Sequence, residues 1–204
     1  VEEQRTASLN FGAGINSNAS IGANITYEQR NFDAANPPDS WSDILNERAY
    51  TGAGQNFRLS LEPGTEATNA SVRFTEPYIF DQLYSFTGEA YYRSRKREIY
   101  DDNRLGGRTT LGKRFDYIWS ASLTLRYENI HIKSIDNKND TVTLEDGSVV
   151  PYRAQEILDE EGYHNLLTLG PSVRRDTTNR GRLLYRGMNS VLGWEKALPI
   201  SGDQ

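Results

Sequence analysis

Residue types that commonly do chemistry are scarce in this chain, and they form no catalytic set. The sequence has two histidines, His131 and His164, and no cysteine. The positions of the histidines suggest no pair of metal ligands, and the lack of cysteine excludes disulfides and thiolate metal sites. The sequence therefore predicts no enzymatic activity, no metal site and no cofactor. The acidic clusters lack the ligand spacing of an EF-hand and predict at most weak calcium binding; they are Asp101-Asp102, Asp136 and Asp159-Glu160-Glu161.

Composition narrows the class of protein further. The chain has 204 residues and a net charge of −5, and this mild acidity argues against a general nucleic-acid binder. No stretch approaches the roughly 18 apolar residues of a membrane-spanning helix. The paired glycines Gly12 and Gly14, like Gly52 and Gly54, are followed by neither a phosphate-loop lysine nor an expected helix. They are expected to mark bends or close approaches in strands.

Alternation of apolar and polar residues with period two is the dominant pattern. In the clearest segment Leu123 and Leu125 fall on one face, and Thr124 and Arg126 fall on the other. Such alternation predicts strands with one apolar face. The expected strands cover residues 6–16, 21–28, 57–62, 70–75, 84–93, 104–114, 119–128, 167–177 and 188–197.

The connections between these segments alternate in chemistry. Those at 76–83 and 113–118 are short and aromatic, and a longer one at 33–51 falls at the same end, whereas those at 62–68, 95–105 and 134–165 are polar and often longer. Alternate turns of an up-and-down sheet lie at the same end, so one end is expected to be tight and aromatic and the other loose and hydrophilic. This pattern is typical of a transmembrane β-barrel, with an aromatic girdle at one membrane interface and long loops at the outer face. Within the longest connection, Asp146-Gly147 predicts a hairpin over 141–152, and a short helix is expected over 153–162.

A soluble antiparallel sandwich is the alternative, because it too has one apolar face per strand. Three features favour the membrane. The apolar faces are rich in small residues, the segments reach about ten alternating residues, and aromatic residues cluster near the tight end. The polar faces carry charges of both signs, which in a barrel would line a wet lumen. The predicted lumen-facing charges are Arg58, Arg73, Glu89, Arg93, Arg126, Glu128 and Arg174.

One motif is more specific. Thr75-Glu76-Pro77-Tyr78 ends a predicted strand, because proline cannot donate to a strand ladder and presets a turn. This stretch resembles the strand-turn motif of the outer-membrane protein assembly factors, the BamA-like barrels of the bacterial surface antigen family, in which a strand ends in Asn/Glu-Pro-Tyr-aromatic. Residues 11–18, 50–55 and 170–178 resemble, in the same order, the first strand and hairpin, the Gly-x-Gly that opens the third strand and a later strand that ends in Arg-Asp-Thr.

The resemblance implies an all-β, antiparallel up-and-down transmembrane barrel in the bacterial outer membrane, which folds and inserts other barrel proteins. In the insertion model, the seam beside the first strand opens and its edge pairs with a client strand. The implied partners are the lipid bilayer, unfolded outer-membrane proteins and accessory assembly subunits, without nucleic acid. The implied client-pairing edge is Leu9, Asn10, Phe11, Gly12, Ala13 and Gly14.

The resemblance also implies sixteen strands, of which about eight or nine are recognisable. Residues 1–204 are therefore interpreted as the N-terminal part of a barrel domain, with a long loop at about 134–165 and with upstream periplasmic repeats and downstream strands outside the sequence. Two alternatives stay open. One is a two-partner secretion pore or another translocation pore of the same fold, and the other is a passive outer-membrane channel.

Overall fold

The fold was analysed in a computed structural model. The structure describes residues 6–15, 21–45, 49–97, 100–134, 141–143, 149–151, 162–178 and 187–198. None of the helices in this part of the chain is long and apolar enough to cross a membrane.

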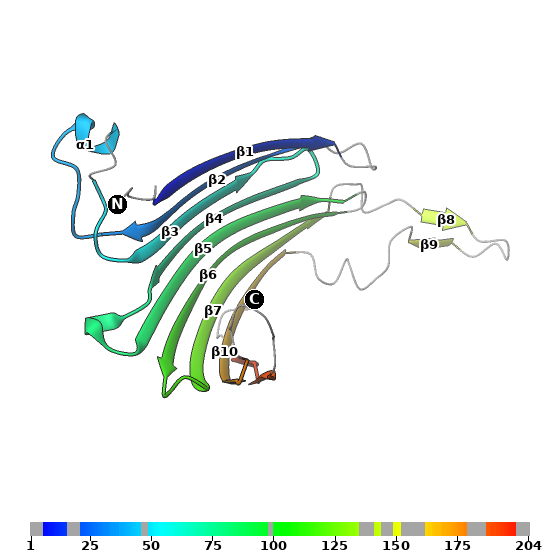
Figure 1. The fold of residues 1–204 in the computed structure, drawn as a ribbon. Coiled ribbons are helices and arrows are strands. Elements are labelled where there is room, and N and C mark those ends of the chain that lie inside the picture. Colours follow the sequence, from blue (N-terminus) through cyan, green and yellow to red (C-terminus); the bar gives the residue numbers. More distant parts are fainter. Residues whose placement is uncertain are drawn as a thin grey trace.

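The main sheet of the described chain is curved and antiparallel, and most of its strands that are neighbours in sequence are neighbours in space (Figure 1). The order is β1-β2-β3-β4-β5-β6-β7-β10-β11, and β12 also pairs with β10. The all-β, up-and-down architecture predicted from the sequence is confirmed. The strands are β1 Ala7–Ile15, β2 Ile21–Phe32, β3 Gln55–Glu62, β4 Ala67–Glu76, β5 Tyr84–Lys96, β6 Tyr100–Arg114, β7 Trp119–Ser134, β10 Gly162–Asp176, β11 Asn189–Gly193 and β12 Lys196–Leu198.

Within the described residues the sheet has ten strands, one more than the nine ranges expected, because the last expected strand is split into β11 and β12. Some strands are also longer than the alternation indicated. β6 begins at Tyr100 although Asp101, Asp102 and Asn103 are poor strand formers, because these residues pair with β5 on one side and β7 on the other. Tertiary pairing thus overrides the local pattern.

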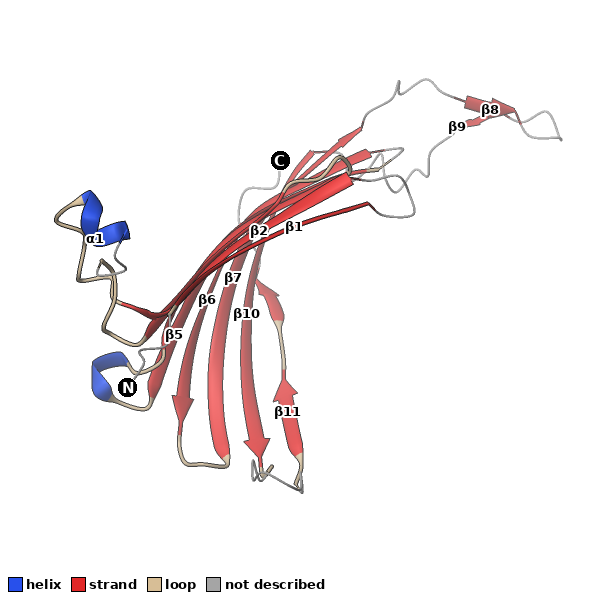
Figure 2. Ribbon diagram, turned by 45° about the horizontal axis from the view of Figure 1, so that its top comes forward, coloured by secondary structure: helices blue, strands red, loops and turns tan. Residues whose placement is uncertain are grey.

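The two ends of the sheet differ in chemistry as predicted, but the expected difference in loop length is largely wrong. At the polar end, residues 63–66 and 97–99 suffice to join neighbouring strands, so the long loop expected over 95–105 is replaced by strand residues. At the aromatic end, residues 33–54 form a longer connection that contains the helix α1 (Trp41–Leu45), and residues 77–83 contain the 3-10 helix η1 (Ile79–Asp81) (Figure 2).

The long connection at the polar end runs over residues 135–161. It contains the predicted hairpin, since β8 (Thr141–Thr143) pairs with β9 (Val149–Pro151). The predicted turn at Asp146-Gly147 and residues 153–161 of the expected short helix lie outside the described residues, and Gly162 begins β10.

The register gives every strand of the main sheet the same two faces. One row across the strands is apolar or small, and the next row is mostly charged, as period-two side chains require. The apolar row contains Leu59, Val72, Ala90, Gly107, Tyr127 and Leu167. The neighbouring row contains Arg58, Arg73, Glu89, Arg108, Arg126 and Thr168.

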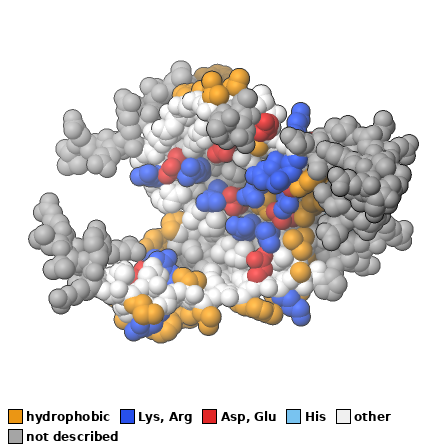
Figure 3. Space-filling model, turned by 90° about the vertical axis from the view of Figure 1, so that its right-hand side faces the viewer, with side chains coloured by type: hydrophobic (Ala, Val, Ile, Leu, Met, Phe, Trp, Pro, Cys, Tyr) orange, Lys and Arg blue, Asp and Glu red, His pale blue; other side chains and the backbone are white. Residues whose placement is uncertain are grey.

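The charged face is the hollow one. Figure 3 shows basic and acidic side chains gathered in the hollow and hydrophobic side chains around the outside. The outward hydrophobic side chains have no cover among the described residues: Leu123 is 44% exposed and Leu125 is 45% exposed. A soluble sandwich would bury such side chains under a second sheet, whereas a membrane barrel leaves them to lipid.

We predict that the two faces of β7 differ strongly in their tolerance of charge. Leu123→Arg should destabilise the lipid-folded protein by roughly 2–4 kcal/mol if this position lies near the bilayer midplane. Thr124→Arg should cost much less, because Thr124 faces the hollow, where its hydroxyl lies 2.9 Å from that of Thr110. Urea unfolding in lipid vesicles measures both variants. Equal destabilisation would contradict the assigned facing.

Candidate functional site: an unpaired edge and a charged wall

The first strand lies at an edge of the sheet. Within the described chain β1 pairs only with β2, from Ala7 opposite Gln29 to Ile15 opposite Ile21. All of its residues after Ala7 are exposed, on both faces. The predicted pairing residues Leu9, Asn10, Phe11, Gly12, Ala13 and Gly14 therefore form one continuous edge with hydrogen-bonding groups available to another strand.

The glycines of this edge are not required by packing. A Cβ atom at Gly12 would lie 3.9 Å from Cβ of Asn24, and one at Gly14 would have no neighbour within 4 Å. Glycine weakens strand order because it leaves the backbone more freedom in the unpaired state. Gly12 and Gly14 therefore leave the backbone of this edge freer to rearrange than residues with a side chain would.

The charged face of the sheet, which lines the hollow, is called the charged wall. It contains an ion pair between neighbouring strands. Arg73 on β4 lies opposite Glu89 on β5, with Nη2 2.8 Å from Oε1. Glu89 in turn lies opposite Arg108 on β6, so one carboxylate lies between two arginines. On its other side Arg73 lies opposite Arg58, which forms no ion pair within the described part of the chain. Arginine is thus in excess along this row.

A second cluster lies on β7 and β10. Arg126 Nη2 lies 2.8 Å from Oε1 of Glu195, and Arg126 Nη1 lies 3.6 Å from Oε2 of Glu128. The hydroxyl of Thr168 donates to the same Glu195 oxygen at 2.6 Å. Glu195 sits between β11 and β12, where the strand is interrupted. This interruption brings the carboxylate of Glu195 into an ion pair with Arg126 of β7.

A tyrosine connects two strands that are not neighbours. Tyr91 on β5 donates a hydrogen bond of 2.6 Å to Glu128 on β7, passing over Gly106 of β6. A Cβ atom at Gly106 would lie 2.6 Å from Cζ of Tyr91, so only glycine leaves room for the ring. Tyr91 is 5% exposed and Glu128 is 3% exposed, which makes this the best-buried polar contact of the wall.

The remaining predicted wall residues lie on the same face but in separate contacts. The guanidinium carbon of Arg93 lies 4.8 Å from the ring centroid of Tyr91. Arg174 contacts Asp176 at 3.3 Å, near the aromatic end of β10. Sequence reasoning did not include Gly106 or Glu195 in the wall. Gly106 gave no signal in the sequence, and Glu195 lay in a segment taken as one continuous strand.

The strand-turn motif is held by hydrogen bonds at the end of β4. The Glu76 carboxylate accepts from Nε2 of Gln55 at 2.8 Å and from the backbone N–H of Tyr78 at 3.1 Å. The hydroxyls of Thr75 and Thr87 lie 3.3 Å apart across β4 and β5. Pro77 follows directly after the strand, where no ladder donor is needed. These hydrogen bonds hold the backbone where β4 ends.

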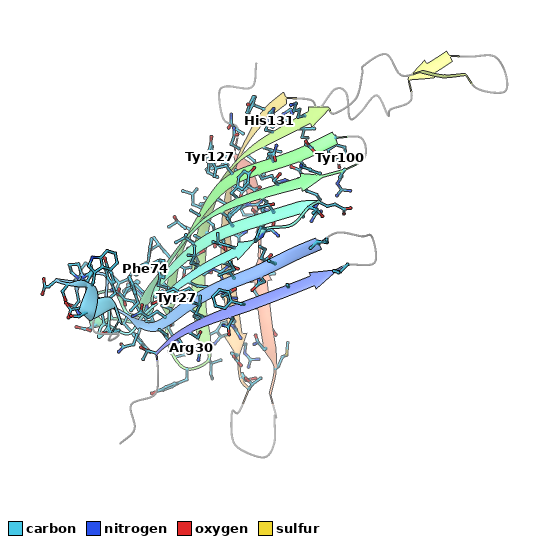
Figure 4. The ribbon with its side chains drawn as sticks, turned by 90° about the horizontal axis from the view of Figure 1, so that it is seen from above. Tyr27, Arg30, Phe74, Tyr100, Tyr127 and His131 are labelled. Atoms are coloured by element: carbon cyan, nitrogen blue, oxygen red, sulfur yellow. The ribbon has the colours of Figure 1, made fainter. Side chains whose placement is uncertain are left out.

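Aromatic residues gather in two zones on the outer face, one toward each end of the strands. Near the aromatic end, the ring of Phe32 stacks on Phe57 and Tyr50, with centroids 5.1 and 5.4 Å apart. Toward the polar end, His131 stacks on Tyr163 at 4.0 Å. Figure 4 shows Phe74 toward one end of the strands and His131 toward the other, with Tyr127 between them. Two aromatic zones bounding an apolar band are typical of a membrane barrel.

The wall has no metal site in the described residues: no group of three histidine, cysteine or acidic side chains comes together there. What the arrangement offers is a pairing edge and a hydrated, arginine-rich surface.

Comparisons with known proteins identify the family. Residues 50–204 match the model of the Omp85 superfamily domain. The chain belongs to the Omp85 superfamily. Among solved structures it is similar to BamA from Haemophilus ducreyi lacking POTRA domains 1-3, with a TM-score of 0.59 and 20% identity. The match covers 97% of this chain and 35% of that one, so the chain spans about a third of that structure. A comparison with curated proteins gave no match.

We predict that the Tyr91–Glu128 hydrogen bond stabilises this Omp85 sheet. Tyr91→Phe leaves the buried Glu128 carboxylate with the more distant Arg126 only, and it should cost about 1–3 kcal/mol of unfolding free energy. Urea unfolding of the lipid-folded protein measures the change. Tyr92→Phe is the matched control, because Tyr92 is 42% exposed on the outer face. Equal effects of the two variants would show that the buried hydrogen bond contributes nothing.

Proposed function

We propose that this protein is an outer-membrane β-barrel assembly factor, which folds and inserts other barrel proteins through a seam at β1. The observation that carries the proposal is the edge itself. β1 pairs with one described neighbour, is exposed on both faces, and contains two glycines that packing does not require. Membership of the Omp85 superfamily and the BamA fold support it.

The physical basis is addition of a strand to an open edge. An exposed edge presents unpaired N–H and C=O groups, which are costly in the membrane interior because no water can satisfy them. A client strand that pairs with β1 satisfies both edges at once, and the alternation of its side chains is then set by the register. The edge thereby templates the first strand of a new barrel.

This mechanism needs a larger barrel than the described sheet. β1 lies at one edge of the sheet, and β11 and β12 lie beyond β10 at the other. We infer that residues 1–204 are the N-terminal part of a barrel of sixteen strands, which is completed by further strands and preceded by periplasmic repeats. The proposed location is the bacterial outer membrane, with the aromatic end in the periplasm. Unfolded barrel proteins are the proposed clients, and accessory assembly subunits are further proposed partners.

A translocation pore of the two-partner secretion type is the second candidate. The charged wall favours it, because a hollow lined by Arg58, Arg73, Arg108 and Arg126 would stay hydrated. A passive channel would use the same wall. Both alternatives need a lumen, and neither needs β1 to pair with another protein.

The proposal predicts cross-linking at the edge. In the complete barrel, Asn10→Cys should form a disulfide with a cysteine in a terminal strand of a folding client. Ser122→Cys should not, because β7 is paired on both sides and Ser122 faces Ser172 across the wall. Residues 1–204 contain no other cysteine, and any cysteine in the rest of the barrel is replaced by serine, so each product reports a single position. Equal yields at the two positions, or cross-links at neither, would contradict strand pairing at β1.

A glycine variant separates an insertion edge from a merely exposed one. Gly12→Ala with Gly14→Ala is accommodated sterically and should make the edge more strand-like by about 0.5–1 kcal/mol per residue. Client insertion should slow while the barrel stays folded. Unchanged insertion would show that edge rearrangement is not limiting, and unchanged insertion without Asn10 cross-links would favour the pore.

A further inference from the structure

The outer face carries two cations at the aromatic end that no described carboxylate neutralises. Lys113 lies near the end of β6, and Arg175 lies near the end of β10. Neither forms an ion pair with a described residue, whereas Arg73, Arg126 and Arg174 on the inner wall do. The nearby Asp116 is engaged in its own turn, where Oδ1 accepts the N–H groups of Ile118 at 2.7 Å and Trp119 at 2.6 Å.

Both cations lie over aromatic rings. Lys113 Nζ is 4.8 Å from the ring centroid of Tyr84 and 5.6 Å from that of Phe115. Arg175 Cζ is 5.9 Å from the ring of Trp119. Aromatic faces hold a cation at the boundary between apolar and aqueous phases, where a lipid headgroup lies.

The register brings the two cations to one place. Lys113 lies opposite Ala121 of β7, and Arg175 lies opposite Trp119 of the same strand. The two cations therefore flank β7 from its two sides, at a strand separation of about 10 Å. Both side chains are long enough to reach one group placed over Trp119 and Ala121.

An apolar groove opens directly beside Lys113. It has a volume of about 340 Å³ and is lined on the outer face by Ile79, Tyr84, Leu111, Lys113, Ala121 and Leu123. The small side chain of Ala121 leaves this space between larger neighbours. The groove leads from the cation into the apolar band, as the acyl chain of a phospholipid does from its phosphate.

We propose that Lys113 and Arg175 bind the phosphate of an anionic phospholipid whose acyl chain occupies this groove. The occupant is a membrane lipid, because the cations, the rings and the groove all lie on the face that meets the apolar phase. A headgroup with net negative charge is favoured over a zwitterionic one, since each lysine or arginine near the surface attracts the anion. The inference goes beyond barrel assembly and requires only that the outer face meets lipid.

The test uses Trp119 as the reporter. In the complete barrel, every other tryptophan, including Trp41 and Trp194, is replaced by phenylalanine. The protein is folded into phosphatidylcholine vesicles that contain a brominated lipid, either phosphatidylglycerol or phosphatidylcholine. In both brominated lipids the bromine atoms lie near the headgroup end of the acyl chains. Bromine quenches Trp119 fluorescence on contact, and quenching against mole fraction gives the relative affinity of each lipid. Phosphatidylglycerol should bind roughly fivefold more tightly, and high salt should weaken the preference.

Variants assign the preference to the site. Lys113→Gln with Arg175→Gln should abolish it, and Ala121→Phe should reduce quenching by both lipids by filling the groove. Lys133→Gln is the control, because Lys133 is an exposed lysine at the polar end of β7. Equal quenching by the two lipids in the unaltered reporter protein would overturn the proposal, even if a variant failed to fold. A preference that survives the double substitution would overturn it too, whereas no quenching by either lipid would contradict lipid contact itself.

Discussion

The structure depends on one constraint, which is the unbroken register of its strand ladder. From β3 through β10 each pair continues without an irregularity, while the one shift near the start of the sheet lies between Gln29 and Phe32. Because side chains alternate with period two, a slip of a single residue would exchange the two faces of a strand. It would move arginines such as Arg73 or Arg126 toward lipid, at a cost of roughly 2–4 kcal/mol each near the midplane. The alternation in the sequence therefore specifies the register as well as the strands.

That same register builds the inner wall. Cross-strand neighbours place Glu89 between arginines, and they place Gly106 where the ring of Tyr91 can pass to Glu128. These contacts tie together strands well inside the sheet. Among the described residues β1 makes no comparable side-chain bond: its residues after Ala7 are exposed, and it has a described neighbour on one side only. The contrast between a cross-linked interior and a lightly held edge is what a seam requires, since an edge can open at low cost only if the rest of the sheet holds.

Much of this arrangement could be predicted from the sequence. The facing of Leu123 against Thr124 follows from alternation, and Pro77 marks the end of β4 because of its missing donor. The start of β6 could not be predicted, since Asp101 and Asp102 carry no apolar alternation and gain their strand from pairing. The Tyr91–Glu128 contact could not be predicted either, because it joins residues on strands that are not neighbours. The alternation also gave no information about connection lengths, which depend on how much chain each end must bridge. The roles of the edge, the motif and the wall remain predictions.

The central claim is that β1 works by opening. The most direct measurement is client insertion by a complete barrel in which a disulfide joins β1, at Asn10→Cys, to the strand that closes against it. The account predicts that the oxidised protein stays folded but inserts no client into lipid vesicles, and that reduction restores insertion. Full insertion by the oxidised, locked barrel would contradict the seam mechanism and would leave β1 as an ordinary strand of the wall.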